Sequence, residues 1–146
     1  MKKTLIAGVA TVFALSFGIA ACGSSDSDDS LSKSELIAQA DAICTKGNEA
    51  LSTKAQAAFG NKQPSNKETV AFISDEIVPL YQGEIDDLRA LQPDDADADD
   101  WNNIVDTLET ELKAVEDDPQ AAKDSQNPFP EASAAAKDFG LEVCGS

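Results

Sequence analysis

The chain contains no histidine, and Arg89 is its only arginine. Histidine is the commonest general base and the commonest transition-metal ligand in proteins. Its absence excludes the usual zinc sites and the Ser-His and Cys-His systems of nucleophilic catalysis. Aromatic residues make up only 5% of the chain, which leaves few rings for the platforms on which sugar-cleaving enzymes seat their substrates. We therefore expect neither a cofactor nor a conventional catalytic centre.

Positive charge is also scarce. The chain has 11 lysine and arginine residues against 27 aspartate and glutamate residues, so its formal net charge is −16. Such a surface repels nucleic acids and anionic lipid headgroups, and nucleic-acid binding is excluded on this ground. A cationic partner, metal ions or simple solubility are the explanations that remain.

The N-terminus has the layout of a secretory signal peptide. Lys2 and Lys3 precede an apolar stretch that covers residues 5–19, and small residues follow it. The stretch ends in Ile19-Ala20-Ala21-Cys22, which resembles the lipobox of bacterial lipoproteins. In that family the leader is cut just before the cysteine, whose sulfur carries a diacylglyceryl group.

This resemblance implies an extracytoplasmic protein that is anchored to the cell membrane by lipid on Cys22. The alternatives are an ordinary cleaved signal and an uncleaved anchor, because the run over residues 4–21 has about the minimum length of a membrane span. The expected organisation is a signal peptide over residues 1–21, a disordered acidic tether over residues 22–30 and a helical domain over residues 31–146. The 125 residues that follow the cut suit one domain and its tether.

Two cysteines remain once Cys22 is assigned to the lipid. Cys44 and Cys144 form an even pair in an exported chain, which favours a disulfide that closes a loop of 100 residues. Two free thiols are the alternative.

The apolar residues recur at helical spacing throughout, and no stretch alternates with period two. Capping boxes at residues 32–35 and 65–68 predict the starts of two helices. The first is expected to end near residue 60. Gly47 interrupts its apolar stripe, which either costs a little helix stability or lets a neighbouring element approach closely. The second is expected to kink at Pro79 and to stop before Gln92, which Pro93 forces out of the helical conformation.

A third helix is expected from Asp99 or Asp100, after an acidic linker over residues 94–100. A fourth is expected from Pro130 to Phe139, with Gly140 as its left-handed C-cap. A weakly patterned stretch over residues 120–127 has room for a short helical turn. These elements predict an all-α fold, a four-helix antiparallel bundle with a kinked second helix and one disulfide that ties helix one to the C-terminus.

Four segments together resemble a known group of proteins. They are residues 40–44 (ADAIC), 78–80 (VPL), 87–93 (DLRALQP) and 139–145 (FGLEVCG). The chain is similar to small helical lipoproteins of actinobacterial type, which carry cysteines near both ends of the domain and have no characterised function. The resemblance implies membrane attachment and one disulfide, and it supplies no catalytic or binding residue.

An acidic motif offers a candidate metal site. Asp95, Asp97 and Asp99 have the D-x-D-x-D spacing that opens an EF-hand calcium loop. The match then breaks, because Asp100 stands where glycine is required and Asp106 where a bidentate glutamate is usual. The two interpretations are a weak calcium site and a solvated acidic start of a helix.

Glu84 and Tyr81 are the candidate ligand-binding residues. Glu84 occupies a position in the apolar stripe, where partial burial can raise a carboxyl pKa. Tyr81 follows the Pro79 kink, and a kinked helix can open a cavity in a bundle. The alternative interpretation places Glu84 at the edge of the stripe, in contact with solvent or with Arg89. Trp101 is a further candidate platform for a ligand, and its alternative role is that of a core residue.

The predicted function is a non-enzymatic binding or scaffolding role of a membrane-anchored lipoprotein in the cell envelope, with an unknown ligand. Its partners are the membrane, through the lipid on Cys22, and an envelope protein or a cationic partner. The alternatives are an envelope hydrolase that relies on carboxylates alone and a weakly calcium-binding lipoprotein.

Overall fold

The computed structural model describes residues 30–146. The predicted signal peptide, the lipobox cysteine Cys22 and nearly all of the tether lie outside the described residues. Within residues 30–146, no helix combines the length and the apolar character that crossing a membrane requires.

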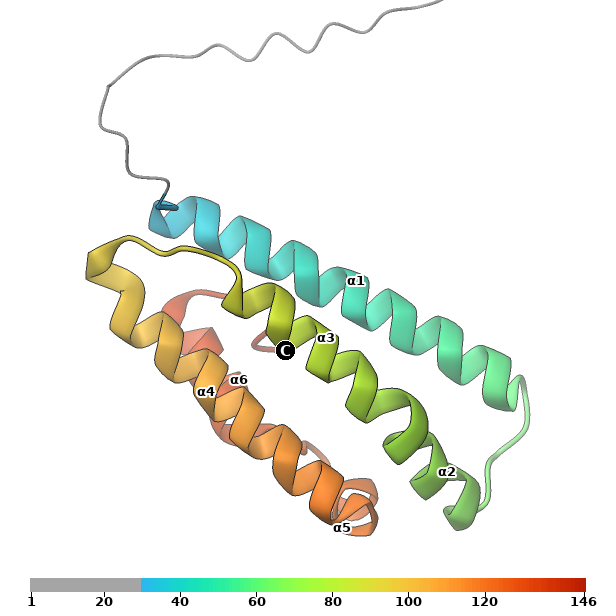
Figure 1. Cartoon of the computed structure of the whole chain (residues 1–146). Coiled ribbons are helices and arrows are strands. Elements are labelled where there is room, and N and C mark those ends of the chain that lie inside the picture. Colours follow the sequence, from blue (N-terminus) through green and yellow to red (C-terminus); the bar gives the residue numbers. More distant parts are fainter. Residues whose placement is uncertain (1–29) are drawn as a thin grey trace, which may run out of the picture.

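The elements of the described chain are all helices, joined by short loops (Figure 1). Its elements, in order, are α1 (Lys33–Phe59), α2 (Asn66–Phe72), the π-helix η1 (Ile73–Ile77), α3 (Val78–Arg89), α4 (Asp95–Asp117), α5 (Pro119–Asp124) and α6 (Pro130–Phe139). The elements α2, η1 and α3 follow one another without a break and return alongside α1. Since α3 packs on both α1 and α4, and α6 packs on α4, the predicted all-α bundle of four main helices is confirmed.

Both predicted capping boxes are present. The backbone N–H of Ser32 donates to Oε2 of Glu35 at 3.1 Å, and the N–H of Ser65 donates to Oε2 of Glu68 at 2.8 Å. These bonds satisfy amides that have no partner inside the helix, which fixes where α1 and α2 begin.

The kink in the second helix is confirmed, and it takes the form of a π-helix. In a regular α-helix the ring of Pro79 would meet the carbonyl group of Asp75, four residues earlier. Here the wider turn of η1 precedes the proline, and the N–H of Val78 bonds to the carbonyl of Ile73 five residues back. Single π turns of this kind are common where a helix bends beside a functional site.

The predicted acidic linker before the third helix is wrong, because α4 already begins at Asp95. Carboxylates in the first turn of a helix interact favourably with the positive end of its dipole. Lys33 of α1 adds an ion pair to Asp97 at 3.4 Å. Together these effects make the acidic residues helical as well. The helix α4 therefore begins before the apolar stripe from which its start was predicted.

The N-terminal end of the described chain lies against the loop between α3 and α4. The N–H of Leu31 donates to the carbonyl of Gln92 at 2.6 Å, and the N–H of Asp94 donates to the carbonyl of Leu31 at 3.1 Å. The hydroxyl of Ser30 donates to Asp94 at 2.7 Å. Ser30, which the sequence assigned to the tether, is therefore held by the folded domain.

The C-terminal segment after α6 is fastened to α1. Gly140 ends α6 in the left-handed conformation, with φ 112°, as predicted. Cys44 and Cys144 form the predicted disulfide, with Cα atoms 5.4 Å apart. In addition, the carboxylate of Asp41 accepts hydrogen bonds from three consecutive backbone amides, residues 142–144, at 2.9–3.2 Å.

Candidate functional site

A cavity of about 160 Å³ lies between α1, α3, α4, α6 and the C-terminal segment. We call it the central cavity. Its lining residues are Cys44, Asn48, Tyr81, Glu84, Leu88, Trp101, Ile104, Leu108, Asn127, Pro128, Phe129, Ala132, Ser133, Ala136, Leu141, Val143, Cys144 and Ser146. An engineered cavity of about 150 Å³ in another protein holds benzene, so this space suits a molecule with one ring.

The helix that follows the π turn places both predicted ligand-binding residues at the central cavity. Tyr81 and Glu84 are three residues apart on α3, so their side chains share one face of that helix. The ring of Tyr81 packs against Phe129, with ring centroids 4.8 Å apart and planes inclined by 31°. The site therefore has an aromatic wall beside a carboxyl group.

Trp101 is a core residue, as the sequence favoured, and it also lines the central cavity. Its side chain is 1% exposed, and its ring packs near Phe139. Its indole Nε1–H is buried and has no hydrogen-bond partner among the described residues. A buried donor without a partner costs about 1–3 kcal/mol. An acceptor atom on a bound molecule would satisfy it.

Glu84 lies at the seam between α1 and α3. On one side it lines the central cavity, and on the other it lines a groove of about 410 Å³, whose lining also includes Lys46, Gly47, Pro79 and Asp87. A Cβ atom on Gly47 would come within 2.1 Å of Oε2 of Glu84. Gly47 is thus a site of close approach, and a larger residue there would displace the carboxyl group of Glu84 from this position.

The environment of Glu84 changes its titration. Burial, followed by the nearby charge of Asp87, raises the pKa of Glu84 from its ordinary value of 4.5 to about 7. Burial, followed by the charge of Glu84, also raises the pKa of Tyr81. Near neutral pH the carboxyl group is therefore divided between its protonated and ionised forms.

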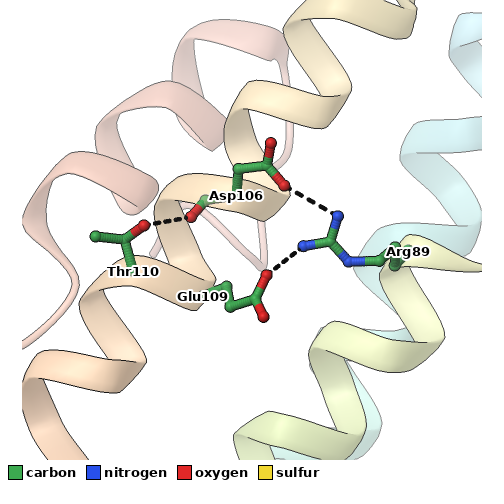
Figure 2. Close-up of polar contacts among 4 residues, drawn as sticks. All are labelled: Arg89, Asp106, Glu109 and Thr110. Carbon is green, nitrogen blue, oxygen red and sulfur yellow. Dashed lines mark hydrogen bonds and ion pairs between the residues drawn. The ribbon is translucent and has the colours of Figure 1, made fainter.

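The alternative in which Glu84 pairs with Arg89 is wrong. Figure 2 shows Arg89 extended toward α4, where Nη1 donates to Asp106 at 2.9 Å and Nη2 donates to Glu109 at 2.6 Å. The Arg89 side chain is 44% exposed, so these pairs contribute little to stability. They join α3 to α4, and among residues 30–146 no lysine or arginine forms an ion pair with Glu84.

The candidate calcium residues do not form a site in this fold. Asp95, Asp97 and Asp99 lie in the first turns of α4, where residues two apart point to opposite sides of the helix. Asp97 is paired with Lys33. No group of three histidine, cysteine, aspartate or glutamate residues within the described range could hold a metal ion.

The arrangement also bears on the hydrolase alternative. Glycoside hydrolysis uses two carboxyl groups that flank the bond to be cut. Among the described residues, Glu84 is the only acidic side chain that lines the central cavity, and Asp87 lines the groove instead. The cavity lining in the described part of the chain therefore has one acidic side chain rather than the flanking pair.

Several lining residues escaped the sequence analysis. Phe129 follows a proline in a short connection, and Asn48 and Ser133 carry no pattern that marks them as cavity residues. The C-terminal residues of the wall join the site because the disulfide and the hydrogen bonds to Asp41 hold them against α1. No model of a known protein family, no curated protein and no solved structure matches this chain.

Proposed function

We propose that this protein is a lipid-anchored, extracytoplasmic binding protein that holds a small molecule in the central cavity. The single observation that carries the binding role is a one-ring-sized cavity lined by Trp101, whose buried indole N–H has no hydrogen-bond partner among the described residues. The lipobox resemblance at Cys22 carries the location. We propose a non-enzymatic role, because Glu84 is the only acidic side chain of the described residues that lines the cavity.

The cavity favours binding over scaffolding. A binding site is concave and mainly apolar, and a few polar groups within it fix the orientation of the ligand. The central cavity has this composition, with Tyr81, Glu84 and Trp101 placed among aliphatic and aromatic side chains. A scaffold requires an extended partner surface and has no need of such a cavity.

Residues 30–146 pack around a shared core. Binding can therefore be measured on residues 22–146 with Cys22→Ser, which we call the soluble form. We expect calorimetric titration of this form with 2-phenoxyethanol to give saturable binding in the micromolar-to-millimolar range of weak ligands. This probe has one ring and an ether oxygen that can accept from Trp101.

Ala132→Leu should abolish that binding, because Ala132 is 3% exposed and lines the cavity that the larger side chain would fill. Ala134→Leu is the matched control, since Ala134 is exposed on the same helix. Circular dichroism would establish that both variants remain helical. Equal binding by the two variants would contradict the proposed site.

A further inference from the structure

We propose that the ligand of the central cavity is a small organic ammonium ion with an apolar body and an oxygen acceptor. This inference rests on the proposed binding function and specifies its ligand. Two chemical groups support the inference. They are the Glu84 carboxyl group between α1 and α3, and the indole N–H of Trp101.

The charge of the cavity wall selects a cation. Glu84 is the only charged side chain in the lining, and no lysine or arginine of the described chain lines the same space. Arg89, one turn along α3, is held by Asp106 and Glu109 (Figure 2). An anionic ligand would meet the carboxylate without any compensating charge, in a protein whose net charge is −16.

The aromatic wall also favours an ammonium group. Tyr81 is three residues from Glu84 and packs on Phe129, so a cation beside the carboxylate lies next to aromatic rings. Ring faces attract ammonium ions, most strongly where water is excluded. The N–H of Trp101, which has no partner among the described residues, can only donate, so an oxygen acceptor on the ligand would satisfy it.

Binding of such a cation depends on the ionised form of Glu84. The titratable side chains near it are Tyr81 and Asp87 on α3 and Lys46 on α1, while α4 and α6 contribute none to the cavity. Ammonium binding should therefore weaken as the pH falls below neutrality, because the carboxyl group gains a proton. A neutral ligand has no such dependence.

Three probes that share a phenoxyethyl-type body and differ in charge test the inference: 2-phenoxyethylamine, 2-phenoxyethanol and phenoxyacetate. In titrations of the soluble form at about pH 8, we expect the amine to bind at least about tenfold more tightly than the alcohol, and phenoxyacetate to bind most weakly. Glu84→Gln should remove the advantage of the amine over the alcohol. Asp86→Asn is the matched control, since Asp86 is exposed on the same helix and lines neither the cavity nor the groove.

The outcomes separate the two proposals. Equal affinity for the amine and the alcohol, or an advantage that survives Glu84→Gln, would overturn the ammonium inference and leave the binding function intact. Binding of the alcohol alone would do the same. If none of the three probes binds at millimolar concentration, both the inference and the proposed function are wrong.

Discussion

Removal of the disulfide, by Cys44→Ala with Cys144→Ala, is expected to lower the free energy of unfolding by about 2–5 kcal/mol. The bond joins residues 100 positions apart, so it restricts the unfolded chain strongly. It also holds the C-terminal wall of the central cavity against α1. Urea denaturation of the soluble form, followed by circular dichroism, measures the loss.

The same double variant should bind 2-phenoxyethanol more weakly, because the wall loses its covalent attachment. The three hydrogen bonds to Asp41 remain, so the segment should loosen without leaving α1 entirely. Reduction of the parent soluble form with dithiothreitol should reproduce both effects, and the reductant should not change the double variant. A double variant as stable as its parent would show that the disulfide contributes nothing beyond these hydrogen bonds.

Glu84→Gln is expected to stabilise the protein at alkaline pH and to leave its stability unchanged in mild acid. The folded state raises the pKa of Glu84 from 4.5 to about 7, so it binds the proton more tightly than the unfolded state does. The stability that this group contributes to the folded state is fully present below about pH 4.5, and it is lost as the pH rises through about 7. A glutamine stays neutral and avoids the loss.

The pKa shift limits the gain in the free energy of unfolding to about 3 kcal/mol. Because Glu84 is partly exposed, solvent screening reduces this gain, and we expect about 1–2 kcal/mol at pH 8. The free energy of unfolding of the two proteins should be compared by urea denaturation at several pH values. Asp86→Asn removes the same charge at an exposed site and should show little of this dependence. A constant difference between parent and Glu84→Gln from pH 4.5 to 8 would mean that Glu84 is not perturbed.

The sequence predicted those parts of the fold that depend on local chemistry. The capping boxes at Ser32 and Ser65, the proline kink and the left-handed Gly140 are each determined by a few neighbouring residues. The start of α4 was misjudged because apolar spacing marks only the buried face of a helix. The acidic residues before Trp101 are helical because of the helix dipole and the ion pair with Lys33, and apolar spacing indicates neither effect.

The candidate site was predictable only in part. Glu84 stood out as a carboxylate in an apolar stripe, and the proline kink drew attention to Tyr81. Nothing in the sequence shows that the indole N–H of Trp101 lacks a partner, because that depends on the packing of four helices. The close approach of Gly47 to Glu84 likewise depends on the register between α1 and α3.

Attachment to the membrane through Cys22 is the claim that places this domain among envelope molecules and in a compartment that oxidises cysteines. The most direct test is cell fractionation of the full chain and its Cys22→Ser variant, with metabolic palmitate labelling. The account predicts that the parent is labelled and sediments with membranes, while the variant is unlabelled and, once its leader is removed, soluble. A fully processed variant that still sediments with membranes, or a parent that never takes up palmitate, would contradict it.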